Sequence, residues 1–315
     1  MKGNDNMNKK LQGTLILMIT AIVWGLSFVS QSVSMDHIGP NTFNGIRTLL
    51  GCVSLLPVIA VIDRTKKKKG EPVMTNKKDL ITGGILCGIL LCAASTIQTY
   101  GLKYTTAGKA GFITTMYMII VPAISFFLGK KIRPVVVLSI IVAMFGMYFL
   151  CIKKGTFVIE IGDIYIFICA IIYAFHIMVI DYFSPKVDGV KLSCMQFLVG
   201  GSINIILMFA IETPVLSDIL ACTGAILYAG IMTCGVAYTL QIIGQKYAEP
   251  TVASIVLSME SVFAVLAGWL ILSEAMTIRE IFGCILAFIA TILVQMPDKK
   301  EADHRHNSDC LFTQG

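Results

Sequence analysis

A carboxylic acid in the middle of a long apolar stretch is the side chain with the clearest chemical potential in this sequence. Glu260 stands within residues 250–272, where no other charged residue occurs. An ionisable group at the centre of a membrane costs roughly 2.5–3.5 kcal/mol or more, so it normally faces a bundle interior or a water-filled cavity. If this stretch crosses a membrane, Glu260 is predicted to contact a substrate amine or to take up and release protons. The alternative is a protonated glutamate that only hydrogen-bonds a neighbouring helix.

Several aromatic side chains and one methionine fall inside other apolar stretches. Rings that carry one polar atom suit an amphipathic solute, because small-molecule pockets are mostly apolar with few placed polar groups. Ordinary helix packing is the alternative for each of them, and the histidine could also relay protons. We predict that seven residues converge on one central substrate-binding pocket near the membrane midplane: Trp24, Met116, Tyr117, Tyr173, His176, Tyr238 and Glu260.

Three further polar residues fall inside or at the ends of apolar stretches. Arg47 could bind a carboxylate, but a structural role, such as reaching the membrane interface or pinning a helix pair, is slightly favoured. Gln98 and Gln241 could form gates or hydrogen-bond a partner helix. We assign all three to gating or helix packing, and we expect no catalytic residue.

The elements that position these side chains follow from composition. The chain has 315 residues, of which 56% are apolar and 14% are charged, and its mean hydropathy is +0.80. Charged residues make up about a quarter of an ordinary soluble domain. A helix of about 20 apolar residues crosses a bilayer and satisfies its own backbone groups there. The sequence therefore predicts an all-α integral membrane protein with ten continuous transmembrane helices, at about 11–33, 41–63, 79–99, 108–128, 134–153, 162–183, 190–212, 219–243, 250–272 and 276–297.

A short motif occurs twice and divides the chain into two halves. Residues 98–104 and 241–247 share Gln, Gly, Lys and Tyr at equivalent positions. Internal similarity of this kind indicates a repeated architecture. We predict a first repeat of five helices over 11–153 and a second over 162–297. Because five is odd, the second repeat must cross the membrane in the opposite direction, and inverted repeats of this kind are typical of secondary transporters.

The distribution of positive charge predicts the orientation. Most of the 25 lysine and arginine residues fall on one side of the expected topology, including the cluster at 64–78. Cytoplasmic loops carry this excess in membrane proteins. The N-terminal segment 1–10 and the polar tail 298–315 are therefore expected to be cytoplasmic, in a multi-pass protein of the cell (inner or plasma) membrane. The net charge of +6 reflects this topology and requires no nucleic-acid partner.

Other classes of protein receive less support from the sequence. The ten cysteines are scattered singly, without a C-x-x-C pair, so we expect buried small hydrophobes and no metal or cofactor. No Walker motif is present, which argues against ATP-driven transport by this chain alone. The alternatives to a secondary transporter are an integral-membrane enzyme acting on a lipid-like substrate and a non-transporting receptor or scaffold. The expected partners are a small-molecule substrate, the lipid bilayer and, as a candidate coupling ion, the proton; the chain could be a monomer or a homodimer.

Short motifs spread along the chain together resemble a known family. They are the pairs Trp24-Gly25 and Ser27-Phe28, the arginine at position 47, and the stretches 257–264 and 270–274. In this order they are similar to the EamA-type branch of the drug/metabolite transporter superfamily, and the resemblance covers about 11–297. It implies a ten-helix transporter of small metabolites, and many members of that family are exporters. Two positions depart from the family pattern: Ser261 stands where a proline is common, and Lys130-Lys131 stand where the first half often has an acidic residue.

Overall fold

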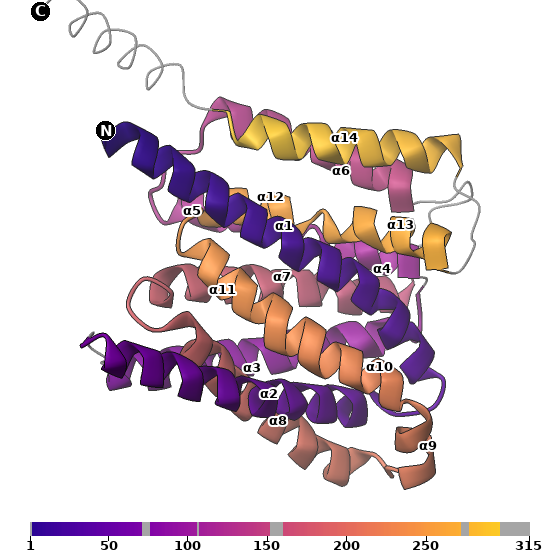
Figure 1. Cartoon of the computed structure of the whole chain (residues 1–315). Helices are drawn as coiled ribbons and strands as arrows, with labels where there is room; N and C mark the ends of the chain where they lie inside the picture. The colour runs from indigo at the N-terminus through magenta and orange to yellow at the C-terminus, as the bar shows by residue number, and fades with distance from the viewer. Residues whose placement is uncertain (1, 71–75, 106, 152–159, 272–276, 297–315) are drawn as a thin grey trace, which may run out of the picture.

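The computed structural model describes residues 2–70, 76–105, 107–151, 160–271 and 277–296 (Figure 1). Within these ranges every regular element is helical, which confirms the all-α prediction. The first half of the chain forms α1 (Lys2–Met35), α2 (Pro40–Lys68), α3 (Lys77–Gly101), α4 (Ala107–Thr114), α5 (Tyr117–Phe127) and α6 (Pro134–Cys151). The second half forms α7 (Ile161–Phe183), α8 (Gly189–Ile211), α9 (Leu216–Ala221), α10 (Thr223–Leu227), η1 (Tyr228–Tyr238), α11 (Thr239–Gln245), α12 (Pro250–Leu257), α13 (Glu260–Ile271) and α14 (Ile278–Val294).

Eight stretches of the described residues are long and apolar enough to cross a membrane. They correspond to the first four predicted spans and to the sixth, seventh, eighth and ninth. The other two predicted spans are shorter as helices: α6 is apolar over Pro134–Phe149, and α14 has 17 residues. The chain is therefore a multi-pass helical membrane protein with eight spans that meet these criteria.

Two long helix pairs flank the rest of the molecule. In Figure 1, α6 and α14 lie together along one side, and α2 and α8 lie together along the opposite side. Most of the other helices lie between these pairs, and α1 crosses against α12, α13, η1 and α11. The centre of the molecule is therefore built from helices of both halves of the chain.

A residue at the end of α8 caps the first turn of α2. Gly39 precedes α2 without a side-chain cap, and the backbone amides of Asn41 and Thr42 donate to the Glu212 carboxylate at 2.8 Å each. The side chains of Asn41 and Thr42 add hydrogen bonds of 2.9 and 2.7 Å. Partial burial acts to raise the pKa of Glu212, but these hydrogen bonds outweigh it and hold that pKa below its ordinary value.

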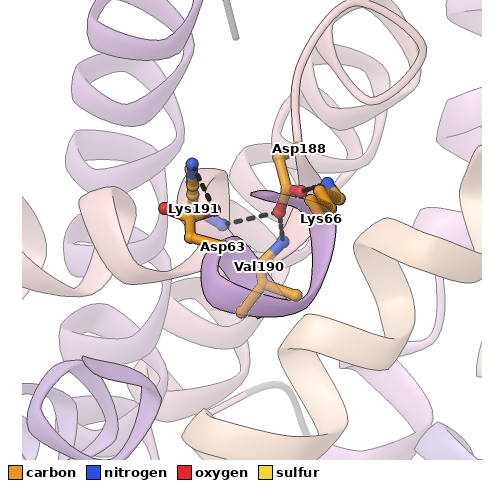
Figure 2. A network of polar contacts seen from close by, with 5 residues as sticks. All are labelled: Asp63, Lys66, Asp188, Val190 and Lys191. Carbon is orange, nitrogen blue, oxygen red and sulfur yellow. Dashed lines mark hydrogen bonds and ion pairs between the residues drawn. The ribbon is translucent and has the colours of Figure 1, made fainter. Parts of the chain in front are cut away.

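Crossed ion pairs join the other end of the same two helices (Figure 2). Lys66 Nζ lies 2.8 Å from Asp188 Oδ2, and Lys191 Nζ lies 2.9 Å from Asp63 Oδ1. Asp188 Oδ1 also accepts the backbone amides of Val190 and Lys191 at 3.1 and 3.3 Å, which caps the first turn of α8. Burial acts to raise the pKa of Asp188, but the hydrogen bonds from Lys66 and the backbone lower it overall. Hydrogen bonds at one end and ion pairs at the other thus join α2 and α8.

Hydrogen bonds from an arginine join α6 and α14 at one end, and the two helices pack closely near their middle. Arg133 donates from its two Nη atoms to the carbonyls of Met296 and Val294, at 3.0 and 3.1 Å. These carbonyls lie at the C-terminal end of α14, where backbone acceptors lack partners within the helix. A Cβ on Gly146 would lie 2.9 Å from the carbonyl oxygen of Gly283, so a glycine is required for this approach.

Two predicted spans, 108–128 and 250–272, each contain a tight turn near their middle, where the backbone dihedral angles stay in the helical region. We call these two tight turns breaks. One interruption separates α4 from α5 at residues 115–116, and the other separates α12 from α13 at residues 258–259. Beside each break a backbone amide bonds to a carbonyl only three residues back, as in a tighter helical turn. The two breaks fall at equivalent positions of the predicted repeats.

Hydroxyl side chains supply a physical reason for these breaks. Thr115 Oγ1 donates to the Phe112 carbonyl at 2.9 Å, and Ser258 Oγ donates to the Ile255 carbonyl at 2.7 Å. Serine and threonine side chains that bond to carbonyls of the preceding turn compete with the regular helical ladder and often bend it. A third irregularity is η1, which winds as a π-helix inside the span Thr223–Gln245.

Candidate functional site

A cavity lies at the centre of the molecule, between helices of both halves of the chain. It contains about 540 Å³ of space not filled by protein atoms, and this figure includes open solvent. Its walls come from α1, α2, α3, the broken helices, α7, η1 and α11, and the lining residues are Trp24, Ser27, Phe28, Gln31, Arg47, Gln98, Thr114, Tyr117, Tyr173, Ile177, Thr233, Tyr238, Gln241 and Glu260.

The two broken helices meet at this cavity through one hydrogen bond. Tyr117 begins α5 and Glu260 begins α13, so each is the first residue after a break. The Tyr117 hydroxyl donates to Glu260 Oε1 at 3.2 Å, and the side chains are only 3% and 6% exposed. The two residues are 143 positions apart, which is the spacing of the repeated motif. The breaks therefore bring a phenol and a carboxyl group from the two halves into contact.

A glycine on α1 sets the distance between this helix and Glu260. A Cβ on Gly25 would lie 2.5 Å from the Cβ of Phe263 and 2.8 Å from the carbonyl oxygen of Glu260. Contacts below 3.0 Å require a shift of backbone here, so glycine allows α1 to approach α13 directly. This approach places the neighbouring Trp24 on the cavity wall.

Aromatic rings form another part of the wall. The rings of Trp24 and Tyr238 have centroids 4.7 Å apart and are tilted by 56°. The hydroxyl of Tyr173 lies 3.5 Å from the hydroxyl of Tyr238 and 3.5 Å from Gln98 Oε1. Gln98 Nε2 in turn donates to Thr114 Oγ1 at 3.2 Å. Ring faces and hydroxyl groups therefore share this surface, as expected for a site that takes an amphipathic molecule.

Polar atoms of several cavity residues have no partner within the described part of the protein. They include the indole nitrogen of Trp24, Thr233 Oγ1 and Gln241 Oε1. Arg47 is 4% exposed, and its Nε donates to Asn44 Oδ1 at 2.9 Å. Buried polar groups without partners are costly, so a water molecule or a bound solute is the natural partner for these atoms. Among the described residues, no cluster of three or more His, Cys, Asp or Glu side chains could hold a metal ion.

Most of the residues that the sequence singled out line this cavity. Of the predicted substrate-binding residues, five are on its wall: Trp24, Tyr117, Tyr173, Tyr238 and Glu260. The three residues assigned to gating or helix packing, Arg47, Gln98 and Gln241, also line it. Their contact with a substrate stays a prediction.

Two predicted residues do not line the cavity. Met116 lies in the break before α5 and packs against the apolar core formed with α12 and α6. His176 is 1% exposed, and its Nε2 lies 3.1 Å from Gln196 Oε1 of α8. The rings of Tyr173 and Tyr238 flank His176 at 6.5 and 6.2 Å between centroids, so it lies behind the cavity wall.

Six lining residues were not predicted: Ser27, Phe28, Gln31, Thr114, Ile177 and Thr233. A helical stripe could have identified three of them, because positions 27, 28 and 31 follow position 24 on one face of α1. Ile177 likewise follows Tyr173 by one turn. No comparable signal distinguishes Thr233, which lies on the π-helical segment.

Comparisons with known proteins agree on a family and a fold. The sequence profile of the EamA-like transporter family matches residues 11–152 and again 160–296. A protein of Archaeoglobus fulgidus named "uncharacterized transporter" is 29% identical over 295 residues, which cover 91% of this chain and 87% of that protein. The Bacillus subtilis protein named "uncharacterized transporter YoaV" is 24% identical over 84% of this chain and 90% of its own length. A crystal structure with 18% sequence identity has a TM-score of 0.72, with 90% of this chain and 96% of that chain covered, and it shares the fold.

Proposed function

The chain belongs to the EamA-like transporter family, and from this premise we propose that it is a secondary active transporter of the cell membrane. It exports a small metabolite, an amino acid or a similar amphipathic solute, by alternating access around the central cavity. The observation that carries the proposal is the meeting of two broken helices at that cavity, through the hydrogen bond from Tyr117 to Glu260. A substrate site near the midplane, where two inverted halves meet, is a recurring feature of secondary transporters.

The proposal includes ten membrane-spanning helices in two inverted repeats, 11–153 and 162–297, with α6 and α14 completing the ten. Equivalent helices of the two halves pair with each other, α2 with α8 and α6 with α14. α3 packs on α7 and α8, while its counterpart, the segment from α10 to α11, packs on α1 and α2. Equivalent helices thus have exchanged neighbours, which supports two repeats related by a two-fold axis in the membrane plane. The family profile matches the chain twice, which supports the same division into two repeats.

The proposed orientation places both termini and the lysine-rich end of α2 in the cytoplasm. The crossed ion pairs of Figure 2 then lie on the cytoplasmic side, and Glu212 lies on the outer side. The excess of lysine and arginine on the first of these sides supports this assignment.

In the proposed cycle the cavity opens to one side of the membrane at a time. Trp24, Tyr173 and Tyr238 hold the apolar part of the solute. Glu260 meets a cationic group of the solute or exchanges a proton, and the proton is the candidate coupling ion. The hydrogen bond from Tyr117 supports this role, because it ties the carboxyl group to the break in the other half of the chain.

A reversible block of the cavity tests the proposal. The purified protein is reconstituted in vesicles of phosphatidylcholine and phosphatidylglycerol loaded with the twenty amino acids, and efflux is followed by mass spectrometry. In a cysteine-free background, Thr233→Cys should allow efflux until a bulky methanethiosulfonate reagent is added, because this side chain lines the cavity. Reduction should restore efflux, which excludes misfolding as the cause of the loss.

Gly224→Cys is the matched control, since no atom lies within 4 Å of a Cβ at that position. The same reagent should leave its efflux unchanged. Efflux through modified Thr233→Cys at the unmodified rate would remove the cavity from the transport path. Absence of efflux from every vesicle that contains the unmodified protein would contradict the proposed transport of these solutes.

A further inference from the structure

Two cysteines of the α2–α8 pair face each other. The Sγ atoms of Cys52 on α2 and Cys194 on α8 lie 3.5 Å apart, and Cys194 Sγ also lies 3.8 Å from the carbonyl oxygen of Cys52. The two residues are 142 positions apart, so the contact joins the two halves of the chain. Within the described ranges, no other hydrogen bond joins two thiols, and every cysteine there is in the thiol form.

The packing of α2 on α8 keeps these two thiols together. A Cβ on Gly201 of α8 would lie 3.0 Å from the backbone nitrogen of Leu49 on α2, so the two backbones are close at this level. The Glu212 contacts at one end of the pair and the crossed ion pairs at the other end fix the register of the two helices. A disulfide forms only between cysteines whose backbones are already close. Reacting groups that are held in contact also react much faster than free ones.

The two thiols differ in their access to solvent. Cys52 is only 6% exposed and packs in an apolar cluster with Leu55 and Phe197. Cys194 is half-buried, and it follows Lys191 of the crossed ion pairs by about one helical turn. The more exposed thiol therefore lies near the charged end of α8, with a buried thiol behind it. Redox-sensor cysteines are accessible and often lie next to a second cysteine that resolves the oxidised intermediate.

We propose that Cys52 and Cys194 form a reversible oxidation site, at which hydrogen peroxide converts the two thiols into a disulfide between the two halves of the chain. One peroxide oxygen is transferred to the Cys194 sulfur, which becomes a sulfenic acid, and the other leaves as water. The Cys52 sulfur then attacks the Cys194 sulfur, and the hydroxyl group leaves with the Cys52 proton as a second water. Two thiols are thus oxidised while one peroxide is reduced to two waters.

This site goes beyond the proposed transport function and does not depend on the solute that the protein carries. The disulfide would connect two helices that belong to opposite halves, in addition to the chain itself. Disulfides of the reducing cytoplasm are usually transient, and thiols of the cell reduce them again. The link is therefore a response to oxidant and not a permanent part of the fold.

The test treats the purified protein in detergent with hydrogen peroxide, blocks the remaining thiols, and maps the peptides by mass spectrometry. The expected product is a peptide pair joined through Cys52 and Cys194, from chains that run as monomers on a non-reducing gel. Dithiothreitol should remove it. The oxidised protein should unfold several degrees above the reduced one, because a bond that closes a long loop restricts the unfolded chain. Absence of this peptide pair, or its presence only in cross-linked dimers, overturns the inference.

Single variants test the order of the two steps. Cys52→Ala lacks the resolving thiol, so peroxide should leave on Cys194 a sulfenic acid that dimedone labels. Cys194→Ala should form no disulfide at Cys52 and take up no label there. Cys284→Ala is the matched control, because Cys284 is a half-buried cysteine of α14 and should leave the Cys52–Cys194 disulfide unchanged.

Two further outcomes would contradict the site. Dimedone on Cys52 in Cys194→Ala, without label on Cys194 in Cys52→Ala, would overturn the assigned order of attack. A peroxide-induced rise of the unfolding temperature in Cys194→Ala equal to that of wild type would show that the rise has another cause. The peptide map of wild type needs no variant, so the inference is tested even where a variant does not fold.

Discussion

The α2–α8 pair and the central cavity treat buried polar side chains differently. At one end of the pair, Glu212 accepts four hydrogen bonds from Asn41 and Thr42. At the other end, two lysines meet two aspartates from the facing helix. In the cavity, by contrast, the indole nitrogen of Trp24 and Gln241 Oε1 have no partner within the described chain. The charged side chains named at the ends of the α2–α8 pair thus all have partners, although Asn41 Oδ1 has none, whereas several polar atoms of the cavity are left open.

This difference indicates that the α2–α8 contacts serve mainly the stability of the fold, whereas the cavity residues serve mainly the binding of a solute. A buried polar group with its partner contributes modestly to stability and costs more when one partner is removed. An unpartnered buried group lowers stability and persists where a ligand completes it. We therefore expect substitutions in the α2–α8 contacts to reduce stability with little effect on solute binding, and substitutions in the cavity to do the reverse.

Glu212→Ala should give the largest loss of stability. It removes the acceptor for two backbone amides and two side chains at the first turn of α2, which is worth about 2 kcal/mol by analogy with helix caps. The measurement is thermal unfolding in detergent. Asp218→Asn serves as the control, because its side chain accepts a hydrogen bond only from its neighbour Ser217 among the described residues. Equal unfolding temperatures for Glu212→Ala and wild type would contradict the assignment of this cap.

The pH dependence of the same variant sharpens the comparison. The folded pKa of Glu212 is lowered, so its contribution is complete above the pKa of the unfolded chain, about 4.3. The contribution disappears as the pH falls through the lower, folded pKa. Wild type should therefore lose stability relative to Glu212→Ala as acid is added, and the two unfolding temperatures should converge.

Gln241→Met should have the smallest effect on stability and a clear effect on binding. The methionine keeps the length of the side chain and removes an unpartnered buried oxygen, so the free energy of unfolding should stay within about 0.5 kcal/mol of wild type or rise slightly. The temperature shift caused by a stabilising amino acid should shrink. A large loss of stability without ligand would show that Gln241 holds the fold, and the contrast between cavity and α2–α8 pair would then be wrong.

Much of the fold could be predicted from the sequence, because hydrocarbon imposes strict rules. A span needs a long apolar helix, so the positions of most helices followed from composition. The sequence also placed Tyr117 and Glu260 in one predicted pocket, and both residues line the cavity. Because helices that face lipid must be long and apolar, a single sequence shows them as long apolar stretches.

The rest depends on contacts that leave no local signal. Residues 108–128 and 250–272 are predominantly apolar from end to end, so the breaks beside Thr115 and Ser258 did not stand out in the hydropathy pattern. His176 and Ile177 are neighbours on one helix, but a rotation of about 100° per residue turns the first toward α8 and the second toward the cavity. Glu212 caps the first turn of α2 through Asn41, which lies 171 positions earlier, and neither segment alone indicates this contact.

The most direct test of the account concerns Glu260 and uses reconstituted vesicles loaded with the twenty amino acids. Glu260→Gln keeps the size of the side chain and its hydrogen bond from Tyr117 but removes its charge and its titration. If Glu260 carries a charge or a proton during transport, Glu260→Gln should fold and insert normally but lose net efflux and its pH dependence. Glu260→Asp should retain part of both. Glu249→Gln, an exposed glutamate just before α12, should behave as wild type. Wild-type efflux with an unchanged pH profile in Glu260→Gln would contradict the account, because a structural, protonated glutamate is well replaced by glutamine.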